Sequence, residues 1–386
     1  MIEERYVRLG LQLGRQVEGV VDAYFGPPEL AAAVMAAPPL EPRALVAEAD
    51  ALLDELDDGW LRDQVRGIRA YAGILAGESR SFAAEAKACY GVRPAYTDEA
   101  VFAAAHERLD ELLPGSGSLA ERREHWKNST VVPADRLERT VAAVIGAARV
   151  RTQALVDLPD GEGVDLELVH DEPWLAYNYY LGGLRGRVAV NADLPMSATE
   201  LLHLAIHETY PGHQAERSIK EHLLVTGRGM LEESLVLVPT PQSLITEGIA
   251  ELAPHMLLDG DGGTAFAAVF AESGIEVDLA HGLAVERAAE PCRWAEVNAA
   301  LMLHEESRSD AEVREYLQRW GLMSPDLAAH LIRFMTDRTS RTYVMTYPAG
   351  YELCSRYVSG DRDRFRELLT RQVRVRDLLD AVSETR

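Results

Sequence analysis

The strongest constraint in this sequence is the stretch HETYPGH at 207–213, which places two histidines six residues apart. Six residues turn a regular α-helix through about 600°, so the two imidazoles would point about 240° apart. Pro211 lacks an N–H group, and Gly212 tolerates nearly any backbone angle. We therefore expect the helix to break here, so that two extra residues bulge out and His213 returns to the face of His207.

A His-Glu pair followed closely by a second histidine is typical of zinc hydrolases. In such sites two neutral imidazoles hold the ion, and the glutamate beside the first acts as a base on a water at the metal. This pattern makes His207 and His213 metal ligands and Glu208 the base. Two other interpretations stay open. His203 and His207 have true i, i+4 spacing and could form the pair instead, or these histidines could be structural or surface residues.

A catalytic zinc site needs a third protein ligand, which leaves one position for water. The best candidate is Glu247, in the expected helix 244–258. Glu251 lies one turn further on the same helix face, where it could accept a hydrogen bond from a ligand histidine and fix its tautomer. His255, another turn along, is a weaker candidate. Without the histidine motif, these glutamates would simply indicate a solvated helix face.

A zinc hydrolase also needs a donor that stabilises the oxyanion formed when water attacks a carbonyl group. Such donors are dense in the stretch 338–351, which is rich in tyrosine and arginine. Tyr347 is the first choice, followed by Arg341 and Tyr343. The alternative is that these are buried tyrosines and surface arginines at a junction between helices.

The rest of the pattern predicts helices around a single β region. Ser197 and Glu200 form a capping box, so a helix should begin at Ala198 and deliver the histidine motif near its end. Alternation and strand-forming residues predict a small antiparallel sheet just before the motif, whose edge strand could bind a substrate backbone or could be purely structural. The expected strands are 164–169, 175–180 and 187–191, with a turn at Gly182-Gly183. The expected helical segments are 1–25, 41–80, 82–113, 133–156, 264–320, 325–338 and 361–382, and 224–243 is expected to be a loop around a short apolar stretch.

Composition narrows the class of protein. The chain is 47% hydrophobic but only 7% aromatic, which favours a soluble helical protein with a large core. A net charge of -23 argues against binding to nucleic acid or to anionic membranes. The three cysteines are scattered, and the N-terminal sequence MIEERYVRLG does not resemble a signal peptide. We therefore expect a cytoplasmic protein without disulfides or a membrane span.

Three segments together resemble a known bacterial family, the one labelled domain of unknown function 885. The stretch 207–214 is similar to its HExxPGHH signature, 246–251 to its EGWALYAE segment, and 347–350 to its late Y-x-x-G stretch. The resemblance implies a mostly helical fold related to the carboxypeptidase Taq and neurolysin groups of zinc peptidases. It also implies the ligands and the base assigned above. The chain departs from the family in its shorter length, in Gln214 at the second histidine of the pair, and in Ile249-Ala250 at the aromatic-bearing WAL.

These features predict a mainly α protein with a zincin-like helical metallopeptidase fold, a deep cleft, and a small antiparallel β-sheet beside the metal site. We expect a single catalytic domain over 1–386, with a helical part at 1–160 and a metal-site part at 161–386. The expected activity is zinc-dependent, carboxypeptidase-like cleavage of short peptides with one Zn²⁺ ion. Hydrolysis of a non-peptide amide or ester is one alternative, and a catalytically inactive binding scaffold is another. The expected partner is a small peptide or other small molecule.

Overall fold

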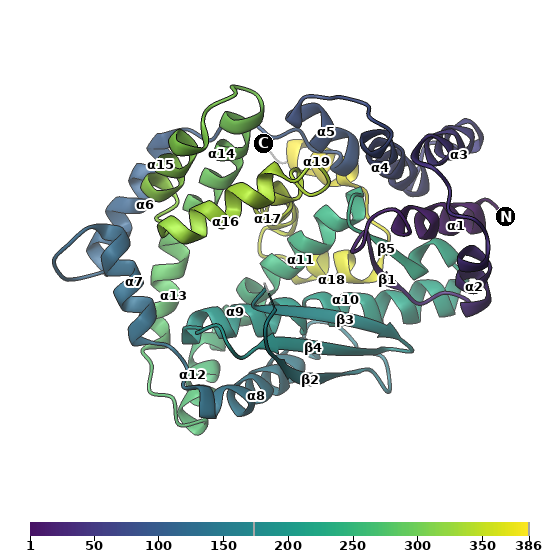
Figure 1. Ribbon diagram of the computed structural model, residues 1–386. Helices are drawn as coiled ribbons and strands as arrows, with labels where there is room; N and C mark the ends of the chain where they lie inside the picture. The colour runs from purple at the N-terminus through teal and green to yellow at the C-terminus, as the bar shows by residue number, and fades with distance from the viewer. Residues whose placement is uncertain (173, 385–386) are drawn as a thin grey trace.

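The computed structural model describes residues 1–172 and 174–384, and over these residues it is mainly helical with two small sheets (Figure 1). The first half of the chain contains α1 (Ile2–Gly14), β1 (Val21–Tyr24), α2 (Pro28–Ala36), α3 (Pro42–Glu55), α4 (Trp60–Leu75), α5 (Phe82–Tyr90), α6 (Glu99–Leu112), α7 (Leu119–Ser129), α8 (Ala134–Thr152), β2 (Gly163–Val169), β3 (Ala176–Gly182) and β4 (Arg185–Asn191).

The second half begins with the helices that carry the histidine motif and ends in a run of short helices. Its elements are α9 (Ala198–Glu208), α10 (His213–Lys220), the π-helix η1 (Glu221–Thr226), η2 (Leu231–Ser234), β5 (Leu235–Leu237), α11 (Pro241–Leu258), α12 (Gly262–Glu272), α13 (Leu279–Ala289), η3 (Glu290–Arg293), α14 (Trp294–His304), α15 (Asp310–Trp320), α16 (Pro325–Thr336), η4 (Tyr343–Met345), α17 (Thr346–Val358), α18 (Arg362–Thr370) and α19 (Val375–Glu384).

The larger sheet has the strand order β2-β4-β3. The hairpin β3–β4 is antiparallel and turns at Gly182-Gly183, where both glycines have positive φ, as the sequence predicts. The prediction of a wholly antiparallel sheet is wrong for β2, which pairs with β4 in parallel. The chain reverses direction between β2 and β3 and again between β3 and β4. The two reversals return β4 to the direction of β2. Because β4 lies next to β2 in the sheet, these two strands pair in parallel.

The expected helix over 1–25 is also wrong beyond its first half. α1 ends at Gly14, and Val21–Tyr24 forms β1, which pairs antiparallel with β5. Val21, Leu235 and Leu237 of these strands face a core formed by α1, α3 and α4, whose buried side chains include Tyr6, Leu45 and Ile68. Ala23 and Val236 pack on Tyr180 of β3 instead. The expected loop over 224–243 therefore contains a strand, and this strand ties the N-terminal segment to the centre of the molecule.

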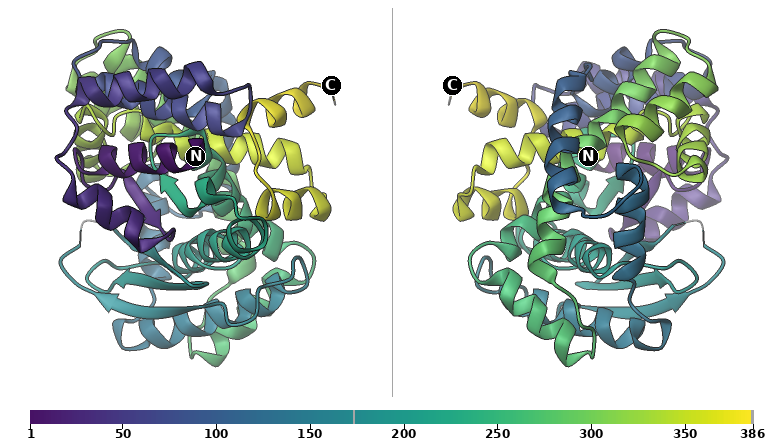
Figure 2. Two further views of the ribbon diagram at one scale, coloured as in Figure 1. Left: turned by 90° about the vertical axis from the view of Figure 1, so that its right-hand side faces the viewer. Right: turned by 90° about the vertical axis from the view of Figure 1, so that its left-hand side faces the viewer.

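The helices of the histidine motif lie where the main core meets the larger sheet. α8, α9 and α10 pack against this sheet, while α11 runs through the middle of the molecule and packs along α17 (Figures 1 and 2). The main core is rich in aliphatic residues from these helices. Burying each large aliphatic side chain contributes about 1.5–3 kcal/mol to the free energy of folding. No helix in the described part of the chain combines the length and the apolar character needed to cross a bilayer.

Candidate metal centre

The chain breaks between α9 and α10, at the place where the proline and glycine predict it. α9 begins at the predicted capping box of Ser197 and ends at Glu208, and α10 begins at His213. A Cβ atom on Gly212 would lie 1.9 Å from the carbonyl oxygen of His207, so only glycine fits where the chain folds back over the helix end. The fold-back brings the rings of His207 and His213 to a centroid separation of 4.7 Å, with their planes at 88°.

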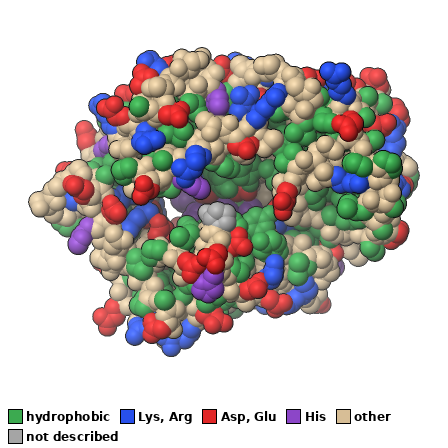
Figure 3. Space-filling view, in the orientation of Figure 1, with side chains coloured by type: hydrophobic (Ala, Val, Ile, Leu, Met, Phe, Trp, Pro, Cys, Tyr) green, Lys and Arg blue, Asp and Glu red, His purple; other side chains and the backbone are tan. Residues whose placement is uncertain are grey.

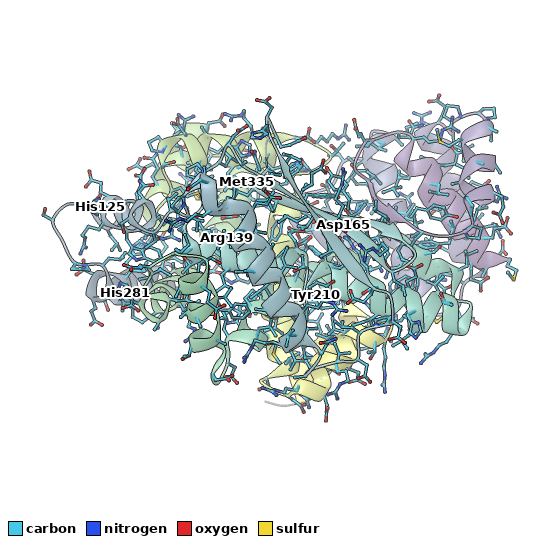
Figure 4. The ribbon with its side chains drawn as sticks, turned by 90° about the horizontal axis from the view of Figure 1, so that it is seen from below. His125, Arg139, Asp165, Tyr210, His281 and Met335 are labelled. Carbon is cyan, nitrogen blue, oxygen red and sulfur yellow. The ribbon has the colours of Figure 1, made fainter. Side chains whose placement is uncertain are left out.

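Tyr210 connects this break to α8 through hydrogen bonds. Its hydroxyl donates a 2.7 Å hydrogen bond to Glu162, and the same carboxylate accepts a 2.7 Å hydrogen bond from Nε of Arg149 on α8. Figure 4 labels Tyr210 near one end of α8, the helix on which Arg139 is also labelled. The Tyr210–Pro211 peptide bond is cis. The hydrogen bonds from Tyr210 and Arg149 to Glu162 therefore connect the break to α8.

Glu247 lies on α11, which packs against α9 and α10 and also crosses α17 very closely. A Cβ atom on Gly248 would lie 2.3 Å from the carbonyl oxygen of Gly350, and one on Gly350 would lie 2.4 Å from the carbonyl oxygen of Leu244. Glycine at both positions lets the two backbones touch. This contact also brings Tyr343, just before α17, within hydrogen-bonding distance of Glu247.

The three predicted ligands converge on one point. Oε2 of Glu247 is 3.5 Å from Nε2 of His207, and Oε1 of the same carboxylate is 3.8 Å from Nε2 of His213. In a tetrahedral zinc site with bonds of about 2.0–2.2 Å, neighbouring ligand atoms are about 3.4 Å apart. All three side chains are buried. Glu247 therefore faces both imidazoles, one with each carboxylate oxygen, at separations close to those between ligand atoms around a small cation.

Glu208 also lies at this point, since one ligand atom each from His207, Glu208 and His213 lie within 4.8 Å of one another. Its carboxylate is 4.0 Å from Nε2 of His207, so it is further from that nitrogen than Glu247 is. Glu247 approaches both imidazoles, which favours Glu247 as the third ligand. Glu208 stands at the distance expected of a base with room for a water in front of it.

An unpaired carboxylate oxygen supports a ligand at this point. Oε2 of Glu247 is buried and has no hydrogen-bond partner among the described residues, and the same holds for Nδ1 of both histidines, the ring nitrogens that do not face Glu247. A buried polar atom without a partner costs about 1–3 kcal/mol, so a folded protein rarely leaves several together. A cation bound by Glu247 would satisfy Oε2, and the residues present therefore fit a zinc ion.

The alternative pair His203 and His207 is also close in space, and these residues form a second group with Glu251. Nε2 of His203 lies 3.5 Å from Glu251, and His203 is half-buried. However, Glu251 is held by two hydrogen bonds from Arg293, one of them 2.9 Å long. The guanidinium already supplies the positive charge that this carboxylate needs, which disfavours a cation in the second group.

Glu251 does not make the predicted hydrogen bond to a ligand histidine, although it lies nearby. Its Oε1 is 3.7 Å from Nδ1 of His207, just beyond hydrogen-bonding distance. His255 is further away, 3.4 Å from Glu290 and stacked on Tyr351. It does not reach the imidazoles of the motif.

Burial and the neighbouring carboxylates set the ionisation of the centre. Burial alone would lower the pKa of His207, but Glu247, Glu208 and Glu251 outweigh it and raise this pKa to about 9. Burial raises the pKa of Glu208 to about 7, and the charge of Glu247 adds to this effect. Burial holds the pKa of His213 well below its usual value, and the charge of His207 lowers it further. Without a metal, His207 and Glu208 therefore hold a proton more readily than the free side chains do, whereas His213 holds one less readily.

The candidate oxyanion donors divide into two groups. Tyr343 donates a 2.7 Å hydrogen bond to Oε1 of Glu247, and Tyr347 packs edge-on against Tyr343 at a centroid distance of 5.5 Å. Burial raises the pKa of both phenols well above the usual value, so both stay protonated as donors. Arg341 is not brought to the site. It is paired through two nitrogens with the buried carboxylate of Glu85 on α5, because that carboxylate requires a charged partner.

Two cavities adjoin the centre. One of about 410 Å³ contains His207, Glu208 and Glu247 on one side and residues of β1 and β3 on the other. A larger one of about 500 Å³ lies beyond Glu251 and is lined by His203, His255 and residues of α13. The predicted ligands His207, His213 and Glu247 all line the smaller cavity. Figure 3 shows the surface hollowed near the middle of one face, with histidine side chains inside the hollow.

No family model matches this sequence, and no curated protein matches it. Two solved structures resemble it. A "putative lipoprotein" from Colwellia psychrerythraea has a TM-score of 0.55 at 15% identity, covering 89% of this chain and 63% of that chain. A "putative lipoprotein of unknown function" from Shewanella oneidensis has a TM-score of 0.55 at 12% identity, covering 92% and 67%. The chain thus spans about two thirds of each protein's length. The likeness shows the fold alone.

The sequence reasoning missed a group of polar residues in the smaller cavity. Arg217, Asp22 and Tyr177 line it together with His207 and Glu208. Arg217 could have been found, because it follows His213 by four residues and so shares its helix face. Asp22 could not, because it lies on β1, which only the pairing with β5 brings into the site.

Proposed function

We propose that this protein is a zinc-dependent hydrolase that cleaves short peptides. The observation that carries the proposal is the position of one carboxylate, Glu247, between Nε2 of His207 and Nε2 of His213 at 3.5 and 3.8 Å. His207, His213 and Glu247 would hold the ion. When bound, zinc supplies a Lewis acid that polarises a carbonyl group and makes a water molecule more acidic.

Glu208 acts as the general base in this proposal. Its buried carboxyl group, with a pKa of about 7, can accept a proton from the attacking water and return it to the leaving amine near neutral pH. Tyr347 is protonated, and no hydrogen bond to Glu247 occupies its hydroxyl. It is the better oxyanion donor of the two phenols, since Tyr343 is committed to orienting Glu247.

The free edge of β3 supports a peptide as the substrate. The N–H of Asn191 on β4 donates to the carbonyl of Leu175, so the backbone groups of Leu175 face β4. Alternation along an antiparallel strand then points the backbone groups of Ala176 and Asn178 away from β4. Both residues line the cavity that contains Glu208. An extended peptide could therefore add to this edge with its scissile bond near the metal centre.

The resemblance of 207–214, 246–251 and 347–350 to the domain of unknown function 885 family supports the same function. A hydrolase of a non-peptide amide or ester would use the same centre but would not need the strand edge. A catalytically inactive scaffold would need neither the base nor the metal.

The decisive experiment combines metal analysis with a substitution of the base. The purified protein should contain about one zinc ion per chain. It should also cleave members of a short-peptide library, and mass spectrometry of the digest would identify the products. Glu208→Gln should keep the zinc and lose turnover by at least about 100-fold, the usual size of a general-base contribution. Glu272→Gln, an exposed glutamate on α12, is the matched control and should match the unaltered protein.

Each alternative gives a different result. A protein that binds zinc and hydrolyses an ester or arylamide, but no library peptide, belongs to the first alternative. A protein that neither contains zinc nor takes it up favours the scaffold. Full turnover by Glu208→Gln would remove Glu208 from the mechanism.

A further inference from the structure

The cavity beside the metal centre contains a buried arginine that the reaction itself does not require. Arg217 follows His213 by four residues on α10, so the two side chains leave the same face with Cβ atoms about 5–6 Å apart. Only about 6% of Arg217 is exposed, yet it lines the cavity together with His207 and Glu208. A buried guanidinium is unfavourable unless charged and hydrogen-bonding groups surround it, so its partners indicate its role.

The partners of Arg217 do not use all five of its N–H groups. Nη2 donates to Asp22, and Nη1 lies 3.3 Å from both the carbonyl and the side-chain oxygen of Asn178. The second oxygen of Asp22 accepts a hydrogen bond from the hydroxyl of Tyr177. Nε of Arg217 is buried and has no partner in the described part of the chain. Both Asp22 oxygens are thus engaged while the guanidinium keeps an unused N–H, which favours an incoming acceptor over an incoming ammonium group.

Arg217 also closes the free edge of β3. The carbonyl of Asn178 would be the next acceptor for an added peptide strand, but Arg217 already occupies it. Asp22 of β1 stands behind the guanidinium. A peptide lying along Ala176–Asn178 would therefore run into this ion pair. Arg217 lines the same cavity as His207 and Glu208, so a peptide held at the metal centre would end beside the guanidinium.

We propose that Arg217, held by Asp22 and Asn178, binds the C-terminal carboxylate of peptide substrates, so that the enzyme removes residues from the C-terminus. This inference rests on the proposed peptidase function. A guanidinium suits the task because its planar N–H groups match a carboxylate in geometry and charge. The N-terminal strand β1 then completes the specificity site, since it supplies Asp22.

The test compares three forms of the best-cleaved library peptide on the zinc-loaded protein. The free acid should be cleaved with a kcat/KM at least 30-fold above that of the C-terminal amide, and N-acetylation should change it less than threefold. Equal cleavage of acid and amide overturns the proposal but leaves the hydrolase intact. Loss of cleavage on N-acetylation also overturns the proposal, because it would show that the Arg217–Asp22 pair binds the N-terminal amine of the peptide. An amide ending in glutamate that is cleaved as fast as the acid assigns Arg217 to a side-chain carboxylate instead.

Arg217→Met should reduce the acid-to-amide ratio to below about threefold, mainly through KM for the acid. Arg217→Lys, which keeps the charge but not the planar fork, should fall in between. An unchanged ratio in the Met variant contradicts the proposal.

A binding measurement covers the case in which a variant fails to fold or no peptide is cleaved. Zinc-loaded Glu208→Gln protein is heated with acetyl-trialanine or with its C-terminal amide. The acid should raise the melting temperature at concentrations at least tenfold lower than the amide. Equal shifts, or none, overturn the proposal. By contrast, failure of the proposed function itself would appear as absent zinc or as turnover that survives in Glu208→Gln.

Discussion

Replacing Gly248 with alanine tests whether the close crossing of α11 and α17 holds the metal centre together. A Cβ atom at this position would lie 2.3 Å from the carbonyl oxygen of Gly350 and 2.7 Å from Sγ of Cys354. Ordinary contact begins near 3.4 Å, so the two helices must separate by about 1 Å. Overpacking of this kind costs about 1–3 kcal/mol, of which the better helix propensity of alanine returns at most about 1 kcal/mol.

The separation would act directly on the metal centre. Glu247 adjoins the substituted residue, and its 2.7 Å hydrogen bond from Tyr343 joins α11 to the segment that leads into α17. A displacement of about 1 Å at a catalytic group can cost about 100-fold in rate. We therefore expect Gly248→Ala to lower the free energy of unfolding by about 1–2 kcal/mol, zinc affinity by about tenfold and kcat/KM by about 100-fold.

Urea unfolding followed by circular dichroism, with and without zinc, gives the first quantity, and competition with a chelating dye gives the second. Gly146→Ala is the matched control, because Gly146 is also inside a helix but its Cβ would meet nothing within 4 Å. This control should raise stability by about 0.5–1 kcal/mol and leave zinc affinity unchanged. If Gly248→Ala behaves like Gly146→Ala in both assays, the helix crossing does not position Glu247.

Three further predictions follow from the same contacts. Tyr347→Phe should lower kcat by about 10–100-fold with zinc content unchanged, because it removes the proposed oxyanion donor but no ligand; a larger effect for Tyr343→Phe would reverse the two roles. Arg341→Leu should leave the buried Glu85 without a charged partner and so destabilise the protein by about 2–4 kcal/mol in thermal unfolding, while kcat/KM stays unchanged. A loss of activity without a loss of stability would show that Arg341 acts in the site. In the metal-free protein, the raised pKa of His207 contributes to the free energy of unfolding. This contribution is complete below about pH 6.5 and is lost as the pH rises through about 9. Urea unfolding should therefore show stability falling between these pH values, and a rise would contradict the assigned charge of His207.

The parts of the site that the sequence predicts are those encoded by neighbouring residues. The capping box of Ser197 sets the start of α9, and Pro211 and Gly212 break the helix within seven residues of local sequence. The turn at Gly182-Gly183 likewise depends on the positive φ that glycine permits. In each case a local steric rule fixes the backbone, so the pattern alone is sufficient.

The parts that the sequence does not predict depend on contacts between distant segments. Val21–Tyr24 has no strand signal of its own and becomes β1 only because β5 offers a pairing edge more than 200 residues later. The pairing of Arg341 with Glu85 depends on how α5 meets the segment before η4. In the sequence, Gly248 and Gly350 each resemble an ordinary helix glycine. Only the structure shows that they allow the backbones of α11 and α17 to approach each other where the two helices cross.

The charge of the buried centre links these local and distant contributions. Glu208 and Glu247 stand beside His207, while Arg293 neutralises Glu251 behind them. Several buried carboxylates around one imidazole are unfavourable unless positive charge is added, and without a cation the centre obtains it by binding protons. A divalent ion would supply the same charge at the same atoms and displace the proton from His207. In the proposed zinc hydrolase, the acidity that makes the metal-free centre costly to bury would also favour the binding of a metal.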